Sequence, residues 1–181
     1  MKRAQLQDQL TSNERQVPRR LPGPFLFLDI DGVLNTWRTR GQFGRDFINP
    51  AAVRLVDDAV ERSSASVVLS TSWTLVDGYR RTVNFLRATG MRADIIGFID
   101  HGLKATDEQL DNGLCDRSVA VLAWMERHAA PGARFVCLDD IRLGGVPLVH
   151  TTDDVGVTLA DTEKIIAALG DSSQAEIISL A

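Results

Sequence analysis

Asp29 and Asp31 are the residues whose type and spacing point most directly to chemistry. They lie one residue apart after the apolar run Phe25–Leu28, and Gly32 follows at once. Two carboxylates in one partly dry space repel each other strongly, so either one is protonated or a cation lies between them. A hard divalent cation with oxygen ligands fits such a pair. The pair therefore predicts a cation-dependent site, and the alternative interpretation is a turn cap or a purely structural cation.

The apolar run before the two aspartates is the element that must position them. Its four residues lack the alternation of a half-buried strand, so they predict a parallel strand covered by helices on both faces. Ligand sites of such sheets lie at the carboxyl ends of the strands. Extended backbone directs the side chains of Asp29 and Asp31 to one side, and Gly32 allows a sharp turn immediately afterwards.

Two further predicted strands end in polar side chains. Residues 65–73 form an apolar stretch that ends in small hydroxyl groups, among them Thr71 and Ser72. Residues 134–138 form another, and Asp139 and Asp140 follow it directly. Because parallel strands end at the same edge of a sheet, we expect these groups near Asp29. A weaker strand is predicted over 148–150, followed by a loop at the sheet end.

Helical signals alternate with these strands. Asn49 is an N-cap followed by proline, which predicts a helix to about Arg62. Further helices are predicted over 77–89, 117–128 and 159–169, with another strand over 93–99. In the helix over 117–128 we expect an inward face made of Val119, Leu122 and Met125, with Trp124 beside them. Residues 35–48 read as an irregular loop or small hairpin, and 100–116 as a loop. This alternation predicts an α/β three-layer sandwich with a central parallel sheet.

The composition is that of an ordinary globular protein. The 181 residues are 44% hydrophobic and 24% charged, with a net charge of -4 that argues mildly against a basic nucleic-acid-coating face. We expect one domain over 25–170, a polar N-terminal arm over 1–24 and a C-terminal tail over 171–181.

The two cysteines, Cys115 and Cys137, show no metal-binding or disulfide spacing. Without a membrane-length apolar run or a signal-like N-terminus, we expect a soluble cytoplasmic protein. The three histidines are expected in loops or at a strand end.

The stretch Phe25–Asn35 resembles the first motif of the haloacid dehalogenase-like (HAD) phosphohydrolases, in which Asp-x-Asp-Gly follows an apolar strand. The resemblance makes Asp29 the nucleophile that takes the phosphoryl group and Asp31 the general acid and base. It places the second motif on Thr71, with Ser72 close behind, where a hydroxyl binds phosphoryl oxygens. It implies Mg²⁺ as cofactor, with Asp29, Asp31, Asp139 and Asp140 as ligands, and leaves open which of the last two binds directly.

The third HAD motif is a cation near the start of the helix that precedes the last catalytic strand. Arg117 occupies this place, and Lys104 in the preceding segment is its competitor. We favour Arg117 because its surroundings resemble the same helix start in small members of the superfamily. Neither interval that usually carries a cap domain has room for a large one.

The Asp-Ile-Asp-Gly-Val-Leu-Asn start, the Ser-Thr-Ser-Trp segment and the Leu-Asp-Asp end resemble small capless HAD domains associated with RNA repair. They are also similar to polynucleotide phosphatase and nucleotidase domains. The resemblance therefore implies a magnesium-dependent phosphomonoesterase that acts on a nucleotide or on a nucleic-acid 3′-phosphate end. Trp37 and its neighbouring arginines either hold a base and an anion or only pack the segment after the first motif. The alternative function is a non-catalytic module that binds a partner or a phosphorylated ligand, and the sequence predicts no oligomeric state.

Overall fold

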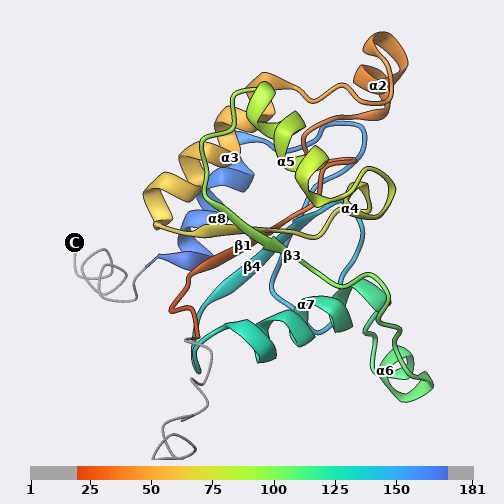
Figure 1. Ribbon diagram of the computed structural model, residues 1–181, viewed down its shortest axis with the longest axis vertical. Helices are drawn as coiled ribbons and strands as arrows, with labels where there is room; N and C mark the ends of the chain where they lie inside the picture. The colour runs from red at the N-terminus through yellow and green to blue at the C-terminus, as the bar shows by residue number, and fades with distance from the viewer. Residues whose placement is uncertain (1–19, 171–181) are drawn as a thin grey trace, which may run out of the picture.

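A central parallel sheet of five strands organises the molecule, which is described here from a computed structural model over residues 20–170 (Figure 1). The strand order is β3-β2-β1-β4-β5, so the strand before Asp29 lies in the middle. The predicted tail and residues 1–19 of the predicted arm lie outside the described residues. The strands are β1 (Phe25–Leu28), β2 (Ser66–Leu69), β3 (Ile95–Phe98), β4 (Phe135–Asp139) and β5 (Leu148–His150).

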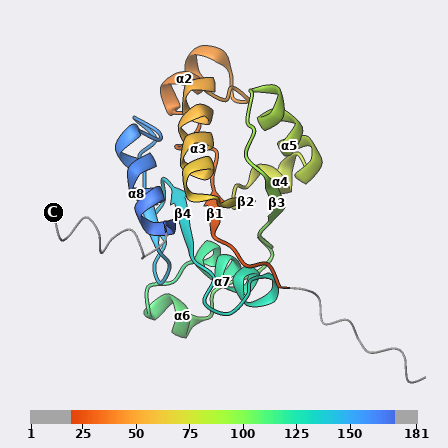
Figure 2. The same ribbon diagram turned by 90° about the vertical axis from the view of Figure 1, so that its left-hand side faces the viewer.

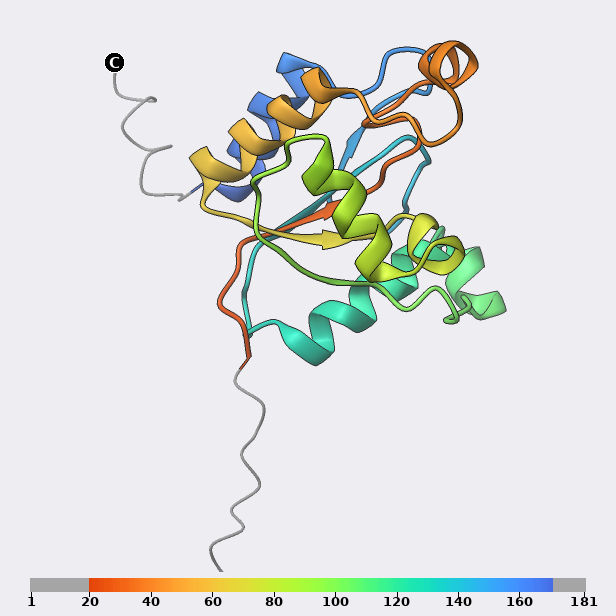
Figure 3. The same ribbon diagram turned by 45° about the horizontal axis from the view of Figure 1, so that its top comes forward.

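Helices cover both faces of this sheet and give the predicted three layers. On one face lie α3 (Pro50–Ser63), α5 (Tyr79–Ala88) and α8 (Leu159–Leu169), and on the other lies α7 (Asp116–His128). The helices α3 and α8 pack side by side (Figure 2). Three short helices surround the carboxyl ends of the strands (Figure 3): α2 (Trp37–Phe43), α4 (Trp73–Val76) and α6 (Asp107–Asp111).

The continuous apolar character of β1 follows from its two buried faces. Leu26 and Leu28 belong to the core cluster beneath α3 and α8, while Phe25 and Phe27 belong to the cluster beneath α7. Both phenylalanine rings meet the ring of Trp124 edge-on, at centroid distances of 5.2 and 5.5 Å. As predicted, β1 lacks alternating polar residues because helices bury both of its faces.

The predicted inward face of α7 is wrong. Ser118, Ala120, Val121 and Trp124 are the buried residues of this helix, whereas Val119, Leu122 and Met125 are only partly buried. The large Trp124 ring determines the face because it fills the space against β1, and helical spacing then turns Val121 inward with it. The other long helices follow their predictions: α3 begins after Asn49, whose side chain accepts from the Ala51 amide at 2.9 Å.

Two helices occupy segments that were predicted as loops. The helix α2 begins at a capping box between Thr36 and Thr39, and α6 begins at one between Thr106 and Gln109. Each box satisfies backbone donors that a short helix leaves unpaired. The predicted helix over 77–89 is present as α5, which begins at Tyr79 after Gly78, and the one-turn helix α4 precedes it.

The chain before β1 contacts the end of α7. The Leu21 amide donates to the His128 carbonyl, and the Ala130 amide donates to the Leu21 carbonyl, each at 2.8 Å. Residues 20–24 are thereby held against the body. Of the helices between residues 20 and 170, none is long and apolar enough to cross a membrane.

Candidate active site

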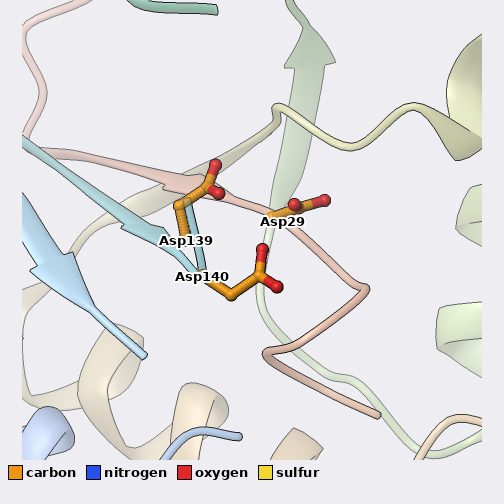
Figure 4. A group of neighbouring side chains, drawn as sticks. All are labelled: Asp29, Asp139 and Asp140. Carbon is orange, nitrogen blue, oxygen red and sulfur yellow. The ribbon is translucent and has the colours of Figure 1, made fainter. Parts of the chain in front are cut away.

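Three carboxylates meet where β1 and β4 end. Asp29, Asp139 and Asp140 each offer an oxygen within 4.8 Å of the others (Figure 4). The parallel pairing of the two strands causes this meeting, because Leu28 lies opposite Leu138 and the Asp29 amide donates to the Leu138 carbonyl at 3.1 Å. Asp29 and Asp139 are buried, and Asp140 is half-buried.

Gly32 makes room for the third carboxylate. Its φ of +71° lies in the left-handed region, which glycine adopts without strain. A Cβ atom on Gly32 would lie 2.5 Å from the Cβ of Asp140 and would overlap its carboxylate. The glycine of the first motif therefore serves both the turn after β1 and the close approach of Asp140.

Arg117 joins two of these carboxylates from the first turn of α7. Its Nη1 atom donates to Asp29 Oδ2 and to Asp139 Oδ2, each at 2.6 Å. Lys104 is not part of this group: its ammonium pairs with Asp116 at 2.8 Å, and its side chain is 72% exposed. The geometry thus places Arg117, and not Lys104, at the position expected for the cation of the third motif.

Burial is the main electrostatic cost of the acidic group. It raises the pKa of Asp29, and the Arg117 guanidinium, the Ile30 amide and the Thr71 hydroxyl oppose this only in part. Burial and the charge of Asp29 raise the pKa of Asp139 to about 6, and the same two causes raise that of Asp140. Burial alone would lower the pKa of Arg117, but the charges of Asp29 and Asp139 raise it overall, so the guanidinium stays charged.

The donor set fits a hard divalent cation. Three carboxyl groups that hold protons more tightly than usual form a place where added positive charge is stabilising. All three offer oxygen atoms, which Mg²⁺ prefers. Asp29, Asp139 and Asp140 are therefore the residues that would hold the ion.

Asp31 lies outside this group, although the sequence placed it among the ligands. Its carboxylate accepts hydrogen bonds from Asn35 Nδ2 and from Trp73 Nε1, each at 2.9 Å. The Arg40 guanidinium is 3.7 Å away, and the Asp31 side chain is 41% exposed. Because the chain turns at Gly32, Asp31 points to the solvent side of the site, where two neutral donors fix its orientation.

Thr71 lies at the end of β2 and is fully buried. Its hydroxyl hydrogen-bonds the Asp29 carboxylate and also accepts from the Trp73 amide at 3.3 Å. The Thr71 carbonyl lies 2.9 Å from His101 Nε2. Ser72 is exposed at the N-terminus of α4 and borders a separate hollow with Trp73 and Arg45.

Trp37 lies on α2, away from the acidic group. Its indole nitrogen donates to Asp154, and the neighbouring Arg40 donates to Asp153 at 2.6 Å. These contacts fasten α2 to the loop after β5, in which Asp153 and Asp154 lie. Trp37 is still 52% exposed, and the guanidinium of Arg38 lies over its ring at 5.3 Å from the centroid.

Four residues that were not among the predicted site residues contact the site. Asn35 and Trp73 orient Asp31 through hydrogen bonds to its carboxylate. His101 contacts Thr71, and burial lowers the pKa of its imidazole. His150 Nε2 lies 2.9 Å from the Asp140 carbonyl. The contact of Asn35 with Asp31 could have been predicted from the sequence, because the two residues are only four apart. The other three contacts join parts of the chain that lie farther apart in the sequence.

Comparison with protein families agrees with this arrangement. Residues 25–162 match the family described as the HAD domain in Swiss Army Knife RNA repair proteins. The chain belongs to this family. The match confirms the predicted HAD resemblance and the α/β fold, and it supports a phosphohydrolase type of activity and a divalent metal in general terms. The comparisons with curated proteins and with solved structures gave no match.

Proposed function

We propose that this chain is a magnesium-dependent phosphomonoesterase that acts through an aspartyl-phosphate on a nucleotide or a nucleic-acid 3′-phosphate end. The observation that carries this proposal is the pairing of Asp29 with Arg117 beside Asp139 and Asp140. A carboxylate in contact with a fixed cation is held for attack on phosphorus. The placing of Asp31 on the solvent side of the same turn provides a second carboxylate for proton transfer.

In the first step an Asp29 carboxylate oxygen forms a bond to phosphorus as the bond from phosphorus to the leaving oxygen breaks. Asp31, in its protonated form, gives its proton to that leaving oxygen. The hydrogen bonds from Asn35 and Trp73 keep the Asp31 carboxyl in one orientation during this transfer. The alcohol departs, and the phosphoryl group stays on Asp29.

In the second step Asp31, now ionised, takes a proton from a water molecule that attacks the same phosphorus. The bond between Asp29 and phosphorus breaks, inorganic phosphate leaves, and both aspartates return to their starting states. Arg117 offsets negative charge near Asp29 throughout, and the Thr71 hydroxyl is available to the phosphoryl oxygens. When bound, Mg²⁺ supplies further charge neutralisation at the phosphoryl group.

Two features support a nucleotide or nucleic-acid end as substrate. The family description concerns RNA repair proteins. Within residues 20–170, the chain between β1 and α3 carries only the short helix α2, and the chain between β2 and α5 carries only the short helix α4, so no large cap covers the carboxyl edge of the sheet there and a bulky substrate can reach it. An open site suits the end of a polymer, and a mononucleotide fits the same chemistry.

The test is phosphate release with Mg²⁺ or with a chelator. The substrates are acetyl phosphate, adenosine 5′- and 3′-monophosphate, and a 3′-phosphorylated oligonucleotide. The active-site variant Asp29→Asn is compared with Asp58→Asn, which changes an exposed aspartate of α3. We expect magnesium-dependent release in the wild type and in Asp58→Asn, and none in Asp29→Asn. Absence of release from every substrate in the wild type, or full turnover by Asp29→Asn, would contradict the proposal.

A further inference from the structure

A pocket of about 620 Å³ opens beside Arg117, on the α7 side of the sheet. Its volume lies within the range of roughly 300–1,000 Å³ that small-molecule sites occupy. The apolar part of its wall consists of Leu75, Leu110, Ala120 and Ile141. Arg117 therefore has the acidic group on one side and, on the other, a pocket with both aliphatic and polar walls.

The walls of this pocket come from segments that follow β2, β3 and β4, which lie on both sides of the central strand β1. Leu75 lies on α4 after β2, His101 follows β3, and Ile141 follows β4. The fourth wall is α6, which carries Leu110. In a parallel sheet these are the positions at which ligands bind. The pocket thus belongs to the functional edge of the sheet, and of the proposed catalytic groups only Arg117 lines it.

Close backbone contact holds the outer wall in place. A Cβ atom on Gly144 would overlap the carbonyl of Gly113, so the loop after β4 and the turn after α6 touch directly. Leu114, next along the chain, lies against Gly145, where an added Cβ would be 3.2 Å from the leucine side chain. The pocket is therefore a built feature of the fold and not a chance gap between loops.

Its aliphatic side chains are unusually exposed. Leu75 is 65% exposed, Leu110 52% and Ile141 44%. Scattered exposed leucines need no explanation, but three that converge on one pocket beside a phosphate-binding cation indicate a ligand surface. The same pocket is also lined by His101, Lys104, Asp116 and Arg117, which can contact a phosphate or a sugar, but these polar groups do not explain why three aliphatic side chains are exposed there. A nucleobase has flat faces with little polarity, and these faces gain from contact with aliphatic side chains.

We propose that this pocket binds the terminal nucleoside of the substrate, with the base between Leu75, Leu110 and Ile141 and the phosphate toward Arg117. The inference rests on the proposed function and adds the residues that select the leaving group. His101 also lines the pocket, and its Nε2 atom lies 2.9 Å from the Thr71 carbonyl, which connects the pocket wall to the end of β2. A free nucleotide and the last nucleotide of an RNA strand share this chemistry.

A cysteine in the pocket wall allows binding to be measured without turnover. Cys115 is half-buried and lines the pocket, whereas Cys137 is fully buried in β4 and serves as the internal control. The alkylation rate of Cys115 in the full-length protein is followed by intact mass, with adenosine, ribose 5-phosphate or no addition. At ten times its dissociation constant, adenosine should slow alkylation by about tenfold, and ribose 5-phosphate should not. No slowing by adenosine, or equal slowing by ribose 5-phosphate, would overturn the proposal.

Two further comparisons identify the source of the nucleoside and the residues that bind it. Adenosine 3′-monophosphate and a short 3′-phosphorylated RNA compete in the same alkylation assay, and the stronger protector identifies the source. The variant Leu110→Asn should raise the KM for the better of the two by about tenfold. Leu159→Asn, which changes a leucine of α8 that is 63% exposed, is the matched control. An equal KM in both variants would refute the role of Leu110.

The alkylation assay keeps the two proposals separate. Wild-type protein that releases phosphate from none of the substrates would contradict the phosphatase proposal, and Cys115 protection by adenosine would still decide whether the pocket binds a nucleoside. Conversely, magnesium-dependent hydrolysis of acetyl phosphate without Cys115 protection would leave the phosphatase proposal intact and refute the pocket.

Discussion

The variant Gly32→Ala tests whether Asp140 contributes to metal binding, independently of how much the substitution destabilises the fold. Gly32 has a φ of +71°, and an added Cβ would lie 2.5 Å from Asp140 Cβ, so Asp140 must move. The left-handed conformation alone costs alanine about 1–2 kcal/mol. In a domain of this size that corresponds to a Tm lower by about 2–8 °C. The displacement of Asp140 adds a loss of metal affinity.

Gly132→Ala is the matched control for this variant. Gly132 has a φ of +78°, and an added Cβ would meet nothing within 4 Å. In the presence of a chelator, Gly132→Ala should lose only the conformational part of this stability, and Gly32→Ala should lose the additional cost of displacing Asp140. Only Gly32→Ala should need more Mg²⁺ for half-maximal phosphate release, by at least about tenfold, because one carboxylate ligand is displaced.

The measurements are thermal unfolding with chelator and phosphate release over a magnesium titration. If Gly32→Ala requires the same Mg²⁺ concentration as Gly132→Ala, Asp140 does not contribute to the ion, and the three-carboxylate interpretation fails. If Gly32→Ala is much less stable than Gly132→Ala but binds Mg²⁺ normally, the overlap with Asp140 matters only for folding.

Three further predictions concern individual charges. Arg117→Ala should lower kcat by about 10²–10³-fold, more than Lys104→Ala, because only Arg117 contacts Asp29; equal losses in a phosphate-release assay would contradict this. Asp139 has its pKa raised to about 6 by burial and by Asp29, so its ionisation destabilises the metal-free fold as pH rises from about 4 to 6. Asp139→Asn should therefore gain stability relative to wild type across this window in chelator, and a constant difference in Tm would refute it. Burial raises the pKa of Asp161, but hydrogen bonds from Lys164 and Thr158 outweigh it and lower the pKa overall. Asp161→Ala should cost about 1 kcal/mol at pH 7, a cost that disappears as pH falls below about 4, and urea unfolding at both pH values measures it.

The sequence was most informative where a local pattern determines the local structure. The run Phe25–Leu28 predicted a central strand because burial on both faces excludes polar residues. Asn49 predicted the start of α3 because its side chain satisfies a backbone amide of the first turn. Asp139 and Asp140 were placed beside Asp29 by the parallel register alone.

The missed helices had weaker signals of different kinds. Thr106 and Gln109 have the standard spacing of a capping box, so the sequence contains a local signal for the start of α6. The acidic residues around this signal are also typical of a solvated loop. The box of α2 uses Thr39 in place of a glutamate or glutamine, and Gly41 lies within the helix. Its stability comes from contacts of Trp37 and Arg40 with the loop after β5, which no local pattern encodes.

The orientation of Asp31 could not be predicted from its spacing in the sequence. Spacing along an extended strand placed both aspartates on one side, but the chain leaves the extended conformation at the end of β1. Asp31 then points toward Trp73, which is 42 residues away in the sequence. Such a contact depends on how α4 packs against the turn, and only the folded structure contains that information.

The contacts of Arg117 explain how one buried group can hold both a guanidinium and a cation. A single nitrogen, Nη1, donates hydrogen bonds to the Oδ2 atom of Asp29 and to the Oδ2 atom of Asp139. The Oδ1 atoms of the same residues accept the amide hydrogens of Ile30 and Ile141, at 2.8 and 3.0 Å. Each carboxylate is therefore fixed at both oxygens. An ionised carboxylate offers about four lone-pair positions, so the oxygens of Asp29 and Asp139 still have capacity for an ion or for attack on phosphorus. Because the backbone and Arg117 already fix the orientation, binding of the ion or the substrate requires little rearrangement.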